Sequence, residues 1–170
     1  MAKFVKRNPV TARYEEESGV TVSAGAGDVG KIPQFDANGK LDISVLPSGI
    51  GAETQAATAT EALSAGDWVN IYNNAGTKSV RKANGSSPGL EANGYVQASF
   101  ANAASATIFT DGANTALTGL TAGAQYYLSA TAGLGTLTPL TAAGNIHQPL
   151  GKASSATSLV FEHFEPLTLA

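Results

Sequence analysis

Residues 67–73 read DWVNIYN, and the turn Asn74-Ala75-Gly76 leads from them into a second β-prone run at residues 78–82. Successive side chains of an extended chain point to opposite faces, so Trp68, Asn70 and Tyr72 share one face and Val69 and Ile71 the other. Small turn-forming residues between two such runs are typical of a β-hairpin. The stretch therefore predicts a strand, a turn and a second strand.

Similar short runs recur through the rest of the chain, separated by Gly, Asn or Pro. They lie at residues 94–100, 106–110, 125–130, 147–153 and 158–164. This spacing is the signature of a small sandwich or barrel and predicts seven or eight strands. The nearest helical candidate, Glu53–Leu63, is rich in Thr and lacks an apolar stripe. The prediction is an all-β protein whose residues 54–170 form a small antiparallel β-barrel or sandwich domain.

Two segments of this domain resemble each other. Leu63-Ser64-Ala65-Gly66-Asp67 precedes one aromatic strand, and Leu120-Thr121-Ala122-Gly123-Ala124 precedes another. One such pair is not a repeat family. We interpret it as one tight turn used twice at the same rim of a barrel.

Residues 1–53 differ in composition from the rest of the chain and predict an extended N-terminal arm. Residues 1–17 are polar and mixed in charge, with no core of their own, and residues 48–53 resemble a linker. Between them, residues 31–47 predict a strand, a tight turn at 36–39 and a second extended piece, too short to fold alone. Its apolar anchors are candidates for docking or oligomerisation contacts: Ile32, Phe35, Leu41, Ile43 and Leu46.

The composition fits a folded protein held in a large assembly or buried against copies of itself, and it also fits a plain exposed β protein. Charged residues make up 14% of the chain, whereas an average soluble domain has about 25%, and 43% of its residues are hydrophobic with a net charge of -3. Disorder usually requires the opposite combination. The pI near 5.3 argues against a nucleic-acid partner.

Other partners and environments are limited by what the sequence lacks. It has no cysteine, which excludes disulfides and thiolate metal sites. No run of about 18 apolar residues exists, so no transmembrane helix is expected. No apolar stretch follows the basic residues Lys3, Lys6 and Arg7, so no signal peptide is expected either.

Residues 25–31, GAGDVGK, have the spacing of a phosphate-cradling loop. Such a loop continues with Ser or Thr and opens a helix, but Ile32 and Pro33 follow here. Residues 36–42, DANGKLD, hint at a calcium loop, yet Lys40 occupies a ligand position and Pro47 stands where Glu is required. We therefore expect neither a bound nucleotide nor a metal, and no cofactor.

Catalytic constellations are also missing. His147 and His163 lie far apart in the sequence without other metal-ligand spacing. No serine lies in a Gly-x-Ser-x-Gly elbow. The remaining carboxylates form no recognisable pair, and the aromatic residues of the β runs are more typical of packing than of a glycan groove. The expectation is a protein that is not an enzyme.

Several segments together resemble structural proteins of tailed bacteriophages. Residues 27–47, GDVGKIPQFDANGKLDISVLP, are similar to a segment of phage head-decoration, head-fibre and tail-fibre proteins. Residues 63–72, 80–83, 92–96, 119–129 and 150–162 are similar to capsid decoration (cement) proteins. The resemblance covers roughly residues 18–170.

The resemblance implies a structural virion protein, a capsid decoration protein made in the host cytoplasm and bound to the outer surface of the head. Its partners would be the major capsid protein and itself, as a homotrimer or, alternatively, a homodimer. Residues 1–53 would dock on the capsid or mediate oligomerisation. The alternative is a head- or tail-fibre module that binds host-surface glycans.

Overall fold

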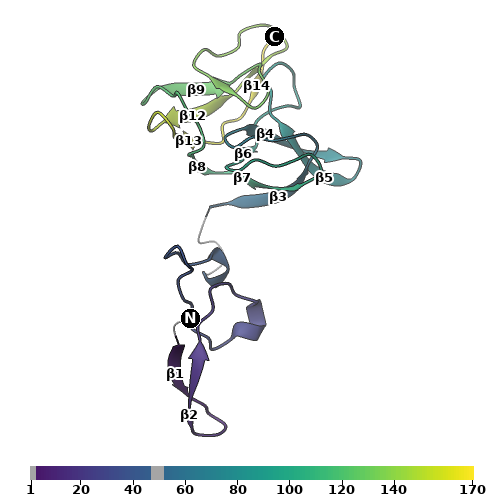
Figure 1. The fold of residues 1–170 in the computed structure, drawn as a ribbon. Coiled ribbons are helices and arrows are strands. Elements are labelled where there is room, and N and C mark those ends of the chain that lie inside the picture. The colour runs from purple at the N-terminus through teal and green to yellow at the C-terminus, as the bar shows by residue number, and fades with distance from the viewer. Residues whose placement is uncertain (1–2, 47–51) are drawn as a thin grey trace. The chain divides into compact units, whose positions relative to one another are not determined.

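The computed structural model describes residues 3–46 and 52–170 (Figure 1). The chain divides into two compact units, Met1–Gly51 and Ala52–Ala170. The boundary expected from composition lay between residues 53 and 54. Each unit is described by itself below. No helix in the described ranges is long and apolar enough to cross a membrane.

The C-terminal unit contains a closed five-stranded barrel (Figure 1), which confirms the predicted fold class. Its strands follow the order β3-β5-β4-β6-β7. They are β3 (Thr54–Ala59), β4 (Trp68–Asn74), β5 (Thr77–Lys82), β6 (Gly94–Tyr95) and β7 (Ser105–Phe109). The pairs are antiparallel except β3 with β5, which is parallel. The expectation of a wholly antiparallel barrel is therefore wrong at this one seam.

A second, five-stranded sheet follows the order β10-β9-β12-β13-β8, and β11 pairs with β14. The elements are β8 (Gly112–Asn114), β9 (Gln125–Leu128), β10 (Gly135–Thr136), β11 (Ile146–His147), β12 (Pro149–Ala153), β13 (Leu159–Phe161) and β14 (Leu167–Thr168). The prediction of seven or eight strands is too low, because strands of two or three residues carry no readable alternation.

The weak helical candidate at Glu53–Leu63 contains strand β3 instead. Ala57 and Ala59 of this strand are buried with Val69 and Val80 inside the barrel. A five-stranded barrel has a narrow interior, which small side chains fill. Since alanine is a good helix former, its use here hides the strand from any propensity-based prediction.

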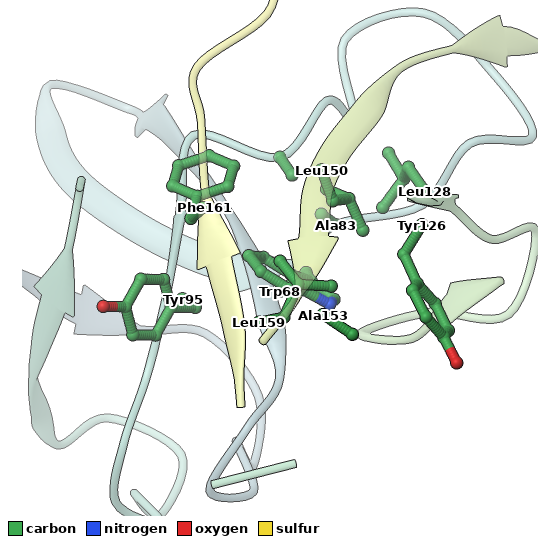
Figure 2. Packing of buried hydrophobic residues seen from close by; sticks show 10 residues of the cluster. Trp68, Ala83, Tyr95, Tyr126, Leu128, Leu150, Ala153, Leu159 and Phe161 are labelled. Carbon is green, nitrogen blue, oxygen red and sulfur yellow. The ribbon is translucent and has the colours of Figure 1, made fainter. Parts of the chain in front are cut away.

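Strand β4 contributes to two hydrophobic clusters because its side chains alternate. Val69 packs inside the barrel with Ile108, whereas Trp68 belongs to a second cluster that includes residues of β9, β12 and β13. Figure 2 shows this second cluster around Trp68. The Trp68 ring lies 5.2 Å from that of Phe161 and 5.7 Å from that of Tyr95. The barrel and the second sheet thus share one aromatic core.

A buried glutamine also links the two parts of this unit. Gln148, between β11 and β12, accepts a hydrogen bond from the backbone N–H of Ala92 and donates one to its carbonyl, both at 2.8 Å. Both residues are inaccessible to solvent, with Gln148 only 1% exposed. The side chain therefore completes the hydrogen bonding of a backbone segment that no strand pairs.

The two similar segments at residues 63–67 and 120–124 form similar turns. Asp67 N–H donates to the Ser64 carbonyl and Ala124 N–H to the Thr121 carbonyl, each at 3.1 Å, and the glycine of each turn has positive φ. The first turn leads into β4 of the barrel and the second into β9 of the other sheet. The turn is reused as expected, but the placement of both at one barrel rim is wrong.

The N-terminal unit begins with a hairpin of β1 (Lys3–Arg7) and β2 (Tyr14–Ser18). The Asn8 side-chain oxygen accepts hydrogen bonds from the N–H groups of Val10 and Thr11, which closes the connecting turn. The sequence predicted an arm without a core for residues 1–17 and did not predict this hairpin. The many charged residues obscure the strand pattern in the sequence. In the structure the basic side chains of β1 pair with the acidic side chains of β2.

The rest of this unit holds two short 3₁₀ helices, η1 (Gly25–Asp28) and η2 (Ile43–Val45). The predicted strand in residues 31–47 is reduced to one bridge, Pro33 with Val20, because proline has no N–H to continue a ladder. The predicted second extended piece is wrong: Asp42 accepts a bond from Ser44 N–H and begins η2. Pro47 lies outside the described residues, and so does the first part of the linker predicted at 48–53.

Candidate functional site

The N-terminal unit carries an apolar surface without a core. None of its residues between 3 and 46 whose burial the structure describes is buried. Its large exposed apolar side chains are Val5, Val10, Tyr14, Val22, Val29, Ile32, Phe35, Leu41 and Leu46. We name this set the N-terminal apolar surface. Exposed apolar side chains in this number, with no core beneath them, make this unit the candidate for contacts with a partner.

Four of the five predicted contact residues belong to this surface. Their exposed fractions run from 36% for Leu46 to 65% for Phe35, with Leu41 and Ile32 between. Ile43 opens η2, but its side chain lies outside the described part of the structure. The four side chains are thus accessible to a partner.

A closed turn positions Phe35 and Leu41. Asp36 N–H donates to the Lys40 carbonyl at 2.8 Å, so Phe35 and Leu41 flank the base of the loop. The Asp36 carboxylate accepts hydrogen bonds from the N–H groups of Lys40 and Asn38, and these bonds lower the pKa of that carboxyl. This is the turn expected from Asn38-Gly39, and the carboxylate serves the backbone.

In the glycine-rich loop at residues 25–31, the polar groups also pair with one another. Lys31 Nζ lies 2.7 Å from Asp28 Oδ1, and the Ala24 N–H donates to the same carboxylate. The lysine bond, followed by that backbone bond, lowers the pKa of Asp28, and Asp28 raises the pKa of Lys31. A phosphate loop instead directs its lysine and its N–H groups toward the ligand. In this loop both groups are directed to Asp28.

The sequence reasoning missed the hairpin members of the N-terminal apolar surface. Tyr14 is 77% exposed and Val5 is also mostly exposed, and both lie on one face of the β1–β2 hairpin. The available signal was the cross-strand charge pattern, a basic KFVKR opposite an acidic YEEES. Charge complementarity of this kind supports antiparallel pairing.

The aromatic side chains of the C-terminal unit are mostly structural. Trp68, Tyr95 and Tyr126 are buried in the shared core, and burial raises the pKa of the Tyr95 hydroxyl. Tyr72 lines a shallow depression on the β4–β5 hairpin, but the Arg81 guanidinium lies 4.2 Å above its ring. Aromatic rings that bind sugars present a free face, so these residues favour packing over a glycan groove.

The titratable side chains do not converge on one place. Asp67 is buried, accepts a hydrogen bond from Ser64 N–H and lies 3.2 Å from Lys82 Nζ, so it stabilises the start of β4. The His147 ring packs on Tyr127, and His163 is exposed. Among residues 3–46 and 52–170, no three His, Asp or Glu side chains cluster as a metal site would require.

No family model, curated protein or solved structure matches this chain. The functional conclusion therefore depends on the resemblance of residues 18–170 and on the N-terminal apolar surface.

Proposed function

We propose that this chain is a non-enzymatic structural protein that decorates the outside of a tailed-phage head. In this proposal the N-terminal unit binds the major capsid protein, and the C-terminal unit stays on the outer surface of the virion. The single observation that supports it best is the N-terminal apolar surface, five of whose residues (Val29, Ile32, Phe35, Leu41 and Leu46) lie in residues 27–47, the segment that resembles phage head-decoration, head-fibre and tail-fibre proteins. Exposed apolar side chains on a unit without a core favour contact with a partner.

The energetics favour binding through several copies at once. Complete burial of a large apolar side chain contributes about 1.5 to 3 kcal/mol. Since Ile32, Leu41 and Leu46 are already partly covered, each would contribute on the order of 1 kcal/mol. One arm then binds weakly, but the arms of a homotrimer or homodimer bind together and gain avidity.

The proposed mechanism is stabilisation by mass action. A protein that binds the assembled shell and not its separate subunits shifts the equilibrium toward the shell. The C-terminal unit suits an exposed position because its barrel is closed, and the outer strands of its second sheet, β10 and β8, have only two and three residues. In this proposal the chain has to bind the shell and stay folded on its surface, and no catalytic step is needed.

The test is co-sedimentation with undecorated capsids. We expect the variant I32S/F35S/L41S/L46S, and a chain lacking residues 1–47, to lose capsid binding. Because the four side chains are exposed, serine should leave the fold unchanged. The matched control, L134S/L137S/V160S/L167S, changes four exposed apolar residues of the C-terminal unit and should bind normally. Undiminished binding by the first variant would refute the proposal.

Counting copies on the virion separates this proposal from the fibre alternative. Decoration places many copies over the whole shell, whereas a glycan-binding fibre occupies only a few positions. Quantitative gel analysis of purified particles gives this number directly.

A further inference from the structure

The β1–β2 hairpin leaves both of its outer edges open. In residues 3–46 and 52–170, the only strand that pairs with β1 is β2, and the reverse also holds. A hairpin alone is at best marginally stable, and an open edge is a template for a further strand. The hairpin is therefore a place where another chain can add.

The two edges carry opposite charge. Strand β1 contains Lys3, Lys6 and Arg7 and no carboxylate, whereas β2 contains residues 15–17, all Glu, and no basic residue. Within one hairpin these charges already attract, since Lys3 Nζ lies 2.9 Å from Glu16 and Lys6 pairs with Glu17. The same attraction is available between one copy and the next.

We propose that copies of this chain associate head to tail, with the β1 edge of one copy pairing with the β2 edge of the next. A two-fold interface uses the same surface on both partners. It would place β1 against β1 or β2 against β2, where like charges face one another at strand-pairing distance and oppose association. Only the unlike pairing brings Lys and Arg side chains opposite Glu.

The hydrogen-bond register of the hairpin leaves backbone N–H and C=O groups on its outer edges free to pair with a strand of the next copy. Asn8 N–H donates to the Arg13 carbonyl at 2.8 Å, which makes this a hydrogen-bonded pair. Bonded and non-bonded pairs alternate along an antiparallel ladder, so Val5 and its partner Glu16 are a non-bonded pair. Their N–H and C=O groups then point away from the hairpin, toward the neighbouring copy.

Head-to-tail pairing also determines how the assembly closes. A heterologous interface produces a ring when the rotation closes, or otherwise a filament. Two hairpins supply four strands, fewer than the five that close the barrel of this chain. Three hairpins supply six. The inference therefore favours a cyclic homotrimer over a two-fold dimer, and it rests on the self-association included in the proposed function.

Sedimentation velocity of the full chain tests the inference with two variants. The basic-edge reversal, K3E/K6E/R7E, makes both edges acidic, and we expect its mass to fall from trimer to monomer. The edge swap adds E15K/E16K/E17K, so that each edge changes sign and the pairs within the hairpin are restored. We expect the swap to recover the trimer. Because the swap also restores the pairs within the hairpin, the mixed-chain measurement below separates restored edge pairing from restored hairpin folding.

Two further measurements complete the test. The control K40E/K78E/K152E has the same net charge as the basic-edge reversal, but its changes lie outside the hairpin, and it should stay trimeric. Mixed wild-type and edge-swap chains should form no mixed trimers by native mass spectrometry, because β1 of one would meet a like-charged β2.

Three results would overturn the inference: a monomeric or dimeric wild-type chain, a trimeric basic-edge reversal, or mixed trimers. Each leaves capsid co-sedimentation as a separate test of the proposed function. If the wild-type chain is monomeric and I32S/F35S/L41S/L46S still loses capsid binding, the head-to-tail pairing is refuted while the proposed function is supported.

Discussion

Replacing Gln148 by leucine should destabilise the C-terminal unit by about 1 to 5 kcal/mol. The side chain is the hydrogen-bond partner of both the N–H and the carbonyl of Ala92, at 2.8 Å each, in a region closed to solvent. Each buried backbone group left without a partner costs about 1 to 3 kcal/mol. Leucine returns about 1 kcal/mol through its apolar surface, which leaves the stated net loss.

Urea unfolding followed by tryptophan fluorescence measures this loss, because Trp68 lies in the shared core. The matched control is Gln125→Leu. The Gln125 side chain donates to the Gly151 carbonyl at 3.0 Å but is only half-buried, so water can replace it and the loss should stay below about 1 kcal/mol. A Gln148→Leu protein within about 0.5 kcal/mol of wild type would refute the assignment of this side chain as an obligatory partner.

Further substitutions test the backbone and the N-terminal unit. Gly151→Ala should cost more than about 3 kcal/mol in urea unfolding, because its Cβ would lie 1.9 Å from the Val160 carbonyl oxygen at a φ of +127°. Ala75→Asn should instead stabilise the unit by up to about 1 kcal/mol, since Ala75 has a φ of 50° in a tight hairpin turn that asparagine tolerates better. The Asp28 carboxyl should titrate below its ordinary pKa of 3.8 because Lys31 donates to it. Its contact with Lys31 should therefore be complete above pH 3.8 and lost as the pH falls through the lowered pKa; carbon-detected NMR titration gives the midpoint, and Lys31→Ala should return it toward 3.8.

The β domain was predictable wherever strands are long and alternate. Residues 67–73 predicted β4 within one residue at each end, because Trp68 and Val69 pack in different clusters and both faces need apolar side chains. The turn at Asn74-Ala75-Gly76 followed from its residue types, and both Ala75 and Gly76 have the positive φ that such a turn requires.

Other elements could not be predicted because tertiary contacts decide them. Strand β3 is built from Thr and Ala, and only closure against β7 and β5 makes it a strand. Residues 31–47 contain β-prone anchors, but the Asp42 side chain captures Ser44 N–H and produces a 3₁₀ turn instead. In each case a local pattern competes with a single hydrogen bond or partner that the sequence does not reveal.

The predicted contact residues rested on a simpler physical signal. A segment too short to bury its apolar side chains is expected to leave them accessible, and Ile32, Phe35, Leu41 and Leu46 are exposed; their contact role stays a prediction. Val5 and Tyr14 were not predicted as contact residues, because charged neighbours surround them in a stretch interpreted as an arm without a core of its own.

The closure of the barrel has a consequence for how the chain folds during synthesis. Strand β3 comes first in the domain, yet its antiparallel partner β7 ends at Phe109, and Trp68 packs on Phe161 close to the end of the chain. Contacts between such distant parts of a sequence form slowly. The barrel can therefore close only after Phe109 has emerged from the ribosome, and the aromatic core can form only after Phe161 has; a product that stops before Phe161 would leave Trp68 uncovered for proteases to find.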